Sequence, residues 1–336
     1  MTASPPRLIT RLLRHIRRLA ILPVSGLLAA GAPSAALADY PDRPIKIVLP
    51  YSAGGGTDML ARVITQRMSQ LLNVPIVIVA RPGASTLIGA REVIQAPPDG
   101  YTLLLSTNTT YSIVPHLYRQ PPFDAQRDLT PISYVAYTPI MLGVHPALPT
   151  RNLAEFIDYA RAHPGKLTYA SYGTGTSTHL IAEMFQAETG TSLTHIPYKG
   201  VEAVHALAGG QVDAMFDGLF TGLPMVQNGR VRPIAVTQPV RSEFAPDIPS
   251  LAESGYPAFD INIWYALAAP KDTPPAIVAR LYAALRHALD DEQVRTSLRG
   301  MQVVPVGLAP PATAEFIEQQ SQRYRDIVKQ AKVPQS

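Results

Sequence analysis

Apolar and polar positions predict alternating strands and amphipathic helices from about residue 44 onward. Ile45–Leu49 is a short apolar run, which predicts a strand ended by Pro50 and the glycines at 54–56. The next segment has helical apolar spacing, at Leu60, Val63, Ile64, Met68, Leu71 and Leu72. Residues 75–79 and 102–106 are further apolar runs. Because these runs are nearly continuous, we expect strands buried on both faces of a largely parallel sheet.

A second block of the same kind begins near residue 139. Asn152, followed by Glu155 three residues later, predicts a helix start. The other expected elements, in chain order, are a strand at 167–170, a helix from about 180 that ends at Gly190, strands at 212–216 and 233–236, and helices at about 275–290 and 312–330. Two such blocks predict an α/β fold, with a ligand between the strand ends of the two.

The N-terminus has the pattern of a secretory signal peptide. Five arginines lie within the first 18 residues, the apolar run Leu19–Ala32 follows, and Ala36-Leu37-Ala38 is a small-residue cleavage site. We expect cleavage after Ala38, which makes 1–38 the signal peptide. An uncleaved amphipathic anchor is the alternative, although the run is shorter than the roughly 20 apolar residues that a membrane span needs.

The composition narrows the function classes. The net charge is +4, but cleavage after Ala38 removes five arginines and no acidic residue, which leaves 24 basic and 25 acidic residues. No basic cluster remains for a phosphate backbone, so nucleic acid is excluded as a partner. The absence of cysteine excludes disulfides, thiolate metal sites and a cysteine nucleophile. We therefore expect an exported protein.

Two glycine-rich loops at helix starts are candidate anion sites. In the first loop, Pro50–Asp58, glycines allow a ligand close to backbone N–H groups, and Thr57 or Asp58 would cap the helix. The second loop, Tyr172–His179, adds hydroxyl groups but matches neither a dinucleotide-binding nor a P-loop pattern. An ordinary strand-to-helix turn is the alternative in each case.

Two further positions could face such a site. Asp217 ends an apolar strand and could accept hydrogen bonds from a ligand hydroxyl or amine, although an Asx turn or a helix cap is the simpler interpretation. Tyr198 and Lys199 precede another expected helix and could point into the cleft or into solvent.

No catalytic constellation is evident. The chain lacks a Gly-x-Ser-x-Gly elbow and a Ser-x-x-Lys pair. His179 and Glu183 lie one helical turn apart, but two ligands do not make a metal site. We expect no catalytic residue, no metal and no cofactor.

Eight motifs in this order resemble the substrate-binding proteins of tripartite tricarboxylate transporters, the TctC-like or Bug receptor family. They are Tyr40-Pro-x-Arg-Pro-Ile, Pro50-Tyr-x-Ala-Gly-Gly-x-x-Asp58, Arg81-Pro-Gly-Ala84, Pro98-Asp-Gly-Tyr-Thr-Leu-Leu104, Gly175-Thr-Ser-x-His-Leu180, His195-Ile-Pro-Tyr-Lys-Gly200, Gly210-Gln-Val-Asp-x-Met-Phe-Asp217, and Trp264 with Ala269-Pro270. The resemblance extends from Tyr40 to the C-terminus.

The resemblance implies a two-domain periplasmic-binding-protein fold (Venus-flytrap, type II-like), with the ligand cleft between the domains. Domain 1 would comprise 39–138 plus 263–336, and domain 2 would comprise 139–262. The implied ligand-binding residues are Tyr51, Ala53, Gly54, Gly55, Thr57, Asp58, Thr107, Thr174, Gly175, Thr176 and Ser177, with Tyr198 and Asp217 at the other end of the ligand. The stretches 83–87 and 107–111 and the residue Ala266 depart from the family pattern, which affects pocket shape.

The implied function is that of a periplasmic receptor. It would bind a small organic carboxylate (a di- or tricarboxylate, an amino acid or an aromatic acid) and deliver it, as a monomer, to the membrane subunits of a transporter. One alternative is a receptor that senses its ligand for a histidine-kinase ectodomain. A less favoured alternative is a secreted hydrolase that uses a serine or threonine of the 173–178 loop.

Overall fold

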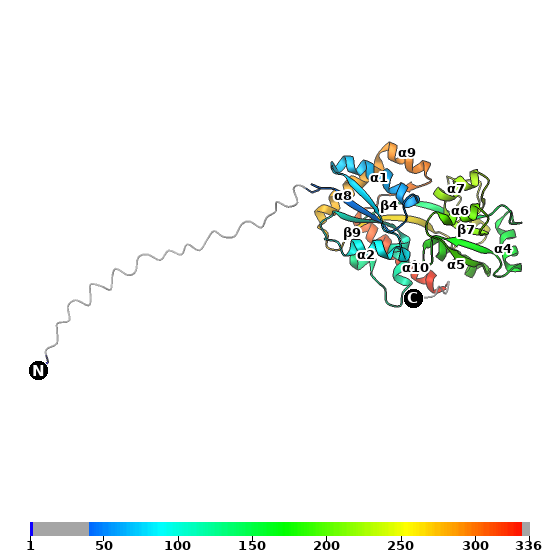
Figure 1. Cartoon of the computed structure of the whole chain (residues 1–336), viewed down its shortest axis with the longest axis horizontal. Helices are drawn as coiled ribbons and strands as arrows, with labels where there is room; N and C mark the ends of the chain where they lie inside the picture. Colours follow the sequence, from blue (N-terminus) through cyan, green and yellow to red (C-terminus); the bar gives the residue numbers. More distant parts are fainter. Residues whose placement is uncertain (3–39, 331–336) are drawn as a thin grey trace. The chain divides into compact units, whose positions relative to one another are not determined.

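A computed structural model describes residues 1–2 and 40–330 of the 336-residue chain. The predicted signal peptide, its apolar run and the cleavage after Ala38 lie outside the described residues. From residue 40 onward, strands alternate with helices that cover both faces of a mixed sheet (Figure 1). None of the helices in this described part combines the length and apolar character that crossing a membrane requires.

The strands form one mixed sheet. Its main order is β2-β1-β3-β9-β4-β7-β5-β6, and β8 and β10 pair with β4. The strands are β1 (Ile45–Leu49), β2 (Ile76–Ala80), β3 (Thr102–Thr107), β4 (Leu129–Val144), β5 (Thr168–Ser171), β6 (Thr194–Pro197), β7 (Ala214–Gly218), β8 (Arg232–Val236), β9 (Asn262–Pro270) and β10 (Val304–Pro305).

The expectation of a largely parallel sheet is wrong in the centre of the sheet. The pairs β1–β2, β1–β3, β5–β6 and β5–β7 are parallel, as expected. However, β3 pairs antiparallel with β9, and β4 pairs antiparallel with β7, β8, β9 and β10. The long strands β4 and β9 run in opposite directions between the two ends of the sheet. An apolar run shows that a strand is buried but not its direction, so the sequence did not reveal this antiparallel centre.

The helices expected near 60–72, 152–160, 180–190, 275–290 and 312–330 and the one after Lys199 are present, and the structure adds others that were not predicted. The helices are α1 (Gly56–Leu72), α2 (Leu87–Ile94), α3 (Ala125–Asp128), α4 (Leu153–Ala162), α5 (Ser177–Thr189), α6 (Glu202–Ala208), α7 (Leu219–Gln227), α8 (Pro275–Asp290), α9 (Glu292–Gly300) and α10 (Pro310–Gln330). The Asn152 side chain accepts a hydrogen bond from the Glu155 amide and caps α4. Gly190, with φ 62°, ends α5 in the left-handed region.

β4 connects the two ends of the sheet. Its first part pairs with β9 as far as Pro139, and its second part pairs with β7 from Ile140 onward. This change of partner lies at the position where we expected the chain to cross between domains. Residues 40–330 nevertheless belong to one compact unit, so the domain bounds 39–138 plus 263–336 and 139–262 stay a prediction.

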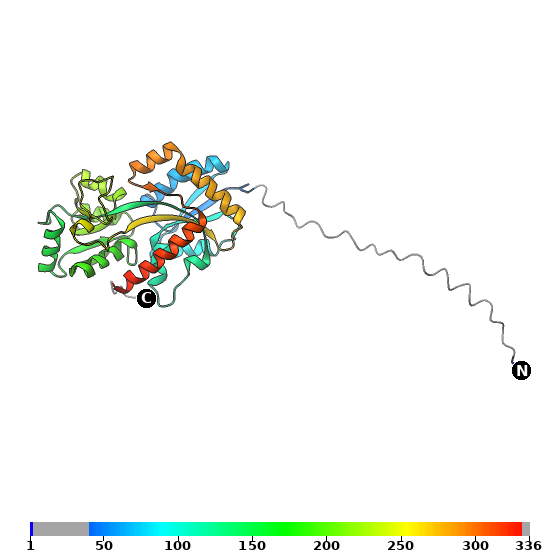
Figure 2. The same ribbon diagram turned by 180° about the vertical axis from the view of Figure 1, so that it is seen from behind.

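Apolar clusters cover both faces of the sheet. Around β1 and β3, residues of α1, α8 and α9 pack on one face, and residues of α2 and the 109–117 segment pack on the other. The helix α10 lies along β4 (Figure 2), where the Thr313 hydroxyl accepts a hydrogen bond from the Tyr134 amide. This packing fixes the strand ends from which the loops project.

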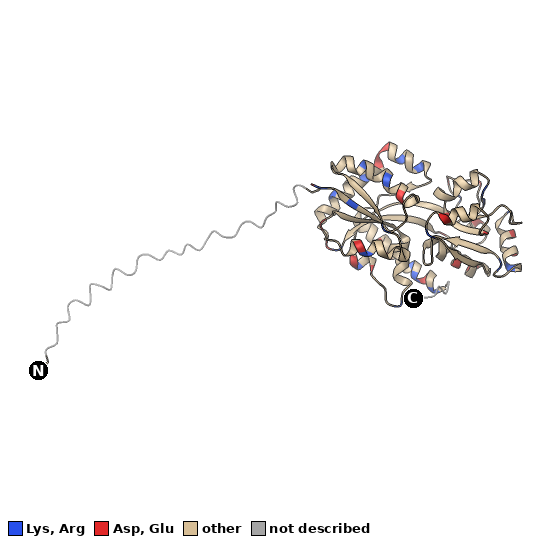
Figure 3. Cartoon of the chain, in the orientation of Figure 1, with Lys and Arg blue, Asp and Glu red and all other residues tan. Residues whose placement is uncertain are grey.

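Basic and acidic residues are interspersed along the described helices (Figure 3). This distribution agrees with the nearly balanced charge that remains after Ala38. Any attraction for an anion therefore has to come from local groups and not from a charged face.

Candidate ligand-binding site

A cavity of about 680 Å³ lies between the N-terminus of α1 and the loops that follow β5, β6 and β7. Most of the predicted ligand-binding residues line it: Tyr51, Gly55, Thr57, Thr107, Thr174, Thr176, Ser177, Tyr198 and Asp217. Ala53, Gly54, Asp58 and Gly175 do not line it, and their contact with a ligand stays a prediction. The cavity thus brings together groups more than 160 residues apart in the sequence.

The first loop presents the N-terminus of α1 to the cavity. The helix begins at Gly56, and the amides of its first turn have no acceptor within the helix. Gly56 and Thr57 both line the cavity, so the N-terminal end of the helix dipole, which favours an anion, lies at the cavity wall. The Tyr51 hydroxyl is fixed beside them, 2.7 Å from Thr107 Oγ1 and 3.2 Å from Ser106 Oγ. Burial raises the pKa of Tyr51, which keeps the phenol neutral.

The expectation that Thr57 or Asp58 caps α1 is wrong. The N-cap residue is Gly55, and no side chain caps the helix there. Asp58 lies inside the first turn and accepts a hydrogen bond from the Gly54 amide at 3.0 Å and one from Arg62 Nε at 3.0 Å. Burial would raise the pKa of Asp58, but hydrogen bonds from Arg62 and Gly54 lower it below its usual value. Asp58 therefore stabilises the first loop through its bonds to Gly54 and Arg62.

Several amides of the second loop already have partners inside the protein. The Gly173 amide donates to Ser171 Oγ at 3.1 Å, and the Gly175 amide donates to His179 Nδ1 at 3.1 Å. The Ser177 amide donates to Thr109 Oγ1 at 3.2 Å. These three groups do not provide the free N–H donors that the glycine-rich pattern suggested. The hydroxyls of Thr174 and Ser177, which have no hydrogen-bond partner among the described residues, are better placed to contact a ligand.

Asp217 is a buried carboxylate in the cavity wall, with 2% of its surface exposed. It accepts hydrogen bonds from the hydroxyls of Tyr172 (2.8 Å) and Thr221 (2.7 Å) and from the Gly218 amide (2.9 Å). Burial raises its pKa to about 6, although these three donors favour the charged form. Asp217 therefore organises the turn after β7 and also lines the cavity, and its contact with a ligand stays a prediction.

Ser85 joins the two sides of the cavity and was not among the predicted residues. Its hydroxyl donates to the Thr174 carbonyl at 2.6 Å. The backbone of Ala84, Ser85 and Thr86 has φ values of 46°, 50° and 81°, in the left-handed region that costs non-glycine residues energy. The departure of residues 83–87 from the family pattern was the only sequence signal for this contact.

Phe220 is a second lining residue that sequence reasoning missed. A Cβ atom added to Gly56 would lie 2.8 Å from Phe220 Cδ1, so this ring lies on the first turn of α1. Lys199, for which the sequence left both the cleft and a solvent-exposed surface position open, also lines the cavity. Both come from elements that fold against α1 only in the tertiary structure.

The arrangement does not support hydrolysis or metal binding. Ser177 has no base, because His179 Nδ1 accepts the Gly175 amide. A serine–histidine pair does occur at Ser171 and His195, 2.6 Å apart, but Ser171 is fully buried and does not line the cavity. Within residues 1–2 and 40–330, no group of three or more potential ligands among His, Cys, Asp and Glu is placed to hold a metal ion.

Comparison with known proteins identifies the family. The sequence model described as "Tripartite tricarboxylate transporter family receptor" matches residues 60–333. The chain belongs to this family. Its members are periplasmic substrate-binding receptors and not enzymes. BugT of Bordetella pertussis is 35% identical to this receptor over 319 residues, which cover 92% of this chain and 97% of BugT.

Solved structures of the family confirm the expected α/β periplasmic-binding-protein fold. R. palustris Rpa4515 with adipate is 33% identical to this receptor, has a TM-score of 0.84, and matches over 88% of this chain and 99% of its own. MatC from Rhodopseudomonas palustris, with bound malate, is 32% identical, has a TM-score of 0.82, and matches over 86% of this chain and 100% of its own.

Proposed function

We propose that this receptor binds a small dicarboxylate in the 680 Å³ cavity and delivers it to a tripartite tricarboxylate-type membrane transporter. The observation that carries the proposal is the α1 N-terminus, where unpaired amides of Gly56 and Thr57 face a cavity rich in hydroxyl groups. The adipate and malate in two solved relatives support the class of ligand.

One carboxylate would accept hydrogen bonds from the α1 amides and from the hydroxyls of Thr57, Thr174 and Ser177. The other end of the ligand would face Tyr198, Lys199 and Asp217. Two or three charge-assisted hydrogen bonds contribute about 1.5–3 kcal/mol each, or roughly 3–9 kcal/mol together. Micromolar affinity requires about 8 kcal/mol after the ordering costs are subtracted, so burial of the ligand's apolar atoms has to add to these bonds. Contact with both sides of the cavity would also favour a closed state over an open one.

The proposal includes export by the N-terminal signal peptide. Export would use the signal peptide 1–38, with cleavage after Ala38, and the mature chain would act as a monomer. N-terminal sequencing of the exported protein would show Asp39 as its first residue. A mature protein that still carries the five leader arginines would contradict export by cleavage and favour the anchor alternative.

A thermal-shift panel tests the ligand class. It compares mono-, di- and tricarboxylates, amino acids and aromatic acids at millimolar concentration, at which a micromolar ligand stabilises the fold by about 4 kcal/mol. We expect the largest shift from a dicarboxylate. If no carboxylate raises the melting temperature while an unrelated solute does, the proposal is wrong.

A receptor that reports to a sensor kinase would bind the same ligands. Reconstituting uptake in vesicles that hold the transporter's membrane subunits separates the two roles. Uptake that depends on this receptor supports delivery, whereas unchanged uptake without it argues for sensing.

A further inference from the structure

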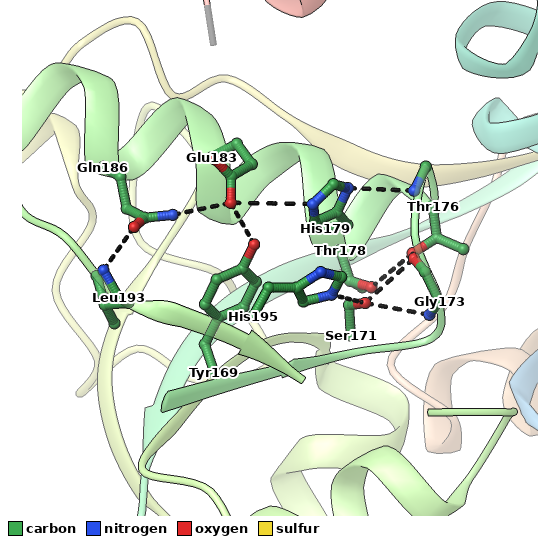
Figure 4. Close-up of polar contacts among 11 residues, drawn as sticks. Tyr169, Ser171, Gly173, Thr176, Thr178, His179, Glu183, Gln186, Leu193 and His195 are labelled. Carbon is green, nitrogen blue, oxygen red and sulfur yellow. Dashed lines mark hydrogen bonds and ion pairs between the residues drawn. The ribbon is translucent and has the colours of Figure 1, made fainter. Parts of the chain in front are cut away.

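Two histidines stack on each other directly behind the second loop (Figure 4). His179 lies in the first turn of α5, and His195 lies in β6. Their ring centroids are 4.2 Å apart, and the ring planes differ by 22°. Tyr169 of β5 also stacks on His195, with the centroids 4.8 Å apart. Neither histidine lines the cavity, so direct contact with a ligand does not account for them.

The ring nitrogens hold the two glycines of the second loop. His179 Nδ1 accepts the Gly175 amide at 3.1 Å, and His195 Nε2 lies 2.6 Å from Ser171 Oγ, which accepts the Gly173 amide. Both glycines have positive φ, 123° for Gly173 and 79° for Gly175. Glycine adopts positive and negative φ about equally well, so the glycines alone do not fix the backbone of this loop. Its conformation therefore depends on the hydrogen bonds to His179 and Ser171.

Further polar contacts fix the histidine pair in turn. Glu183 Oε1 lies 3.9 Å from His179 Nε2 and accepts hydrogen bonds from Tyr169 and from Gln186, the latter at 2.9 Å. The Gln186 side chain also accepts the Leu193 amide at 2.6 Å, which ties α5 to the start of β6 (Figure 4). Burial lowers the pKa of both histidines to about 4, so the His179 lone pair that accepts the Gly175 amide is present at neutral pH.

We propose that His179 and His195, as an uncharged stacked pair, are positioning residues that fix the second loop for ligand binding. They turn the Gly175 amide away from the cavity and leave Thr174, Thr176 and Ser177 on its wall. This inference rests on the proposed function, because it assigns the pair a role in the affinity for the carboxylate. The pair acts through the loop and does not touch the ligand.

The test uses two substitutions at one position. His179→Phe keeps a stacked ring and removes the nitrogen that accepts the Gly175 amide. His179→Asn places an amide oxygen near the former Nδ1 and restores an acceptor. The control is His287→Phe on the exposed surface of α8, far from the second loop in sequence and without a role in it. His195→Phe and His195→Gln repeat the comparison for the bond to Ser171.

Two readouts are measured on the full mature chain. The first is amide hydrogen exchange across residues 172–177 without ligand, and the second is the affinity for malate and adipate by calorimetry. We expect His179→Phe to exchange faster in this segment and to bind about tenfold more weakly, because it leaves a buried N–H without an acceptor. His179→Asn should restore most of the slow amide exchange and most of the affinity. His287→Phe should change neither the exchange rate nor the affinity.

The outcomes are distinguishable. The positioning role is overturned if His179→Phe leaves exchange in 172–177 unchanged, if it speeds exchange without weakening binding, or if His179→Asn fails in the same way as His179→Phe. If His179→Phe does not fold, the test compares wild type with His179→Asn. The positioning role then predicts near-wild-type amide exchange and affinity for His179→Asn, and clearly faster exchange or weaker binding would contradict it. If wild type binds neither acid, the proposed function fails for dicarboxylates, and the exchange measurement alone shows whether the pair holds the loop.

Discussion

Asp217 shows at the scale of one residue how burial changes chemistry. Its carboxylate has 2% of its surface exposed, and its pKa is raised from 3.8 to about 6. Three donors satisfy the charged form, yet desolvation outweighs them. The folded state therefore holds this proton more tightly than the unfolded chain does, which makes the side chain a source of pH dependence near the ligand.

We predict that Asp217→Asn becomes more stable relative to wild type as the pH rises. The folded pKa lies above the unfolded one, so the stabilisation from protonated Asp217 is complete below pH 3.8 and lost as the pH rises through about 6. Asparagine does not titrate, so the difference in unfolding free energy should shift by roughly 2 kcal/mol in its favour between pH 4 and 7. Urea unfolding at several pH values measures this.

Histidine titrations act in the same pH range with the opposite sign. Burial lowers the pKa of His179 and His195 to about 4, so their stabilisation is lost as the pH falls below 6.5. Both proteins of the Asp217 comparison share these histidines, so their contribution cancels in the difference. A pH-independent difference would show that Asp217 is not the titrating group.

Ser85 offers a second residue-scale prediction. Ser85→Ala and Ser85→Gly both remove the hydrogen bond to the Thr174 carbonyl, but only glycine relieves the left-handed backbone at φ 50°. We expect Ser85→Gly to be more stable than Ser85→Ala by roughly 1 kcal/mol in urea unfolding. Equal stabilities, or a more stable alanine variant, would mean that the backbone at this position is not strained.

At the scale of elements, α1 depends on a side chain that supports its first turn. Asp58 accepts the Gly54 amide and pairs with Arg62, and only 4% of its surface is exposed. Asp58→Ala should lower the free energy of unfolding by about 1 kcal/mol, because it removes the acceptor of the Gly54 amide and the carboxylate that the first turn of α1 favours.

Arg62→Ala is the matched control for this prediction. The Arg62 side chain is 63% exposed, so loss of the ion pair alone should cost less than 1 kcal/mol. If the two variants are equally destabilised, the ion pair and not the Gly54 hydrogen bond holds the first loop. Circular dichroism during chemical denaturation measures both variants.

The elements that sequence predicted best carry strong local signals. Asn152 with Glu155 marked the start of α4, and the amphipathic pattern at 275–290 predicted α8. By contrast, α9 buries only Val294 and Leu298, which is too little apolar periodicity to stand out. The strand β4 was also hidden, because Pro131 and Pro139 interrupt its pattern while long-range pairing with β9 and β7 holds it extended.

The site was predictable only where the chain signals it locally. The glycines of the first loop predicted an anion site at a helix start, and the residues that begin α1 line the cavity. The second loop has the same signal, but Gly175 is turned inward by His179, a consequence of the packing of α5 against β6. Ser85 and Phe220 reach the cavity from distant segments, and no short-range pattern identifies such residues.

At the scale of the whole molecule, two strands link the cavity walls. β4 changes its partners at Pro139–Ile140, and β9 starts beside this point at Asn262. The side chains that line the cavity come from both ends of the sheet, so a ligand that contacts both ends would stabilise their closed arrangement. With 24 basic and 25 acidic residues after Ala38, selectivity for an anion would rest on helix-end amides and hydroxyls.

The most direct test of the account is calorimetric titration of the mature chain with malate and adipate, beside the neutral diamide of each acid. We predict a dissociation constant on the order of 1 μM or tighter for a dicarboxylate. The matching diamide should bind at least about 100-fold more weakly, because it lacks the charge that the α1 amides favour. Absence of binding by both acids, or equal binding of an acid and its diamide, would contradict the account.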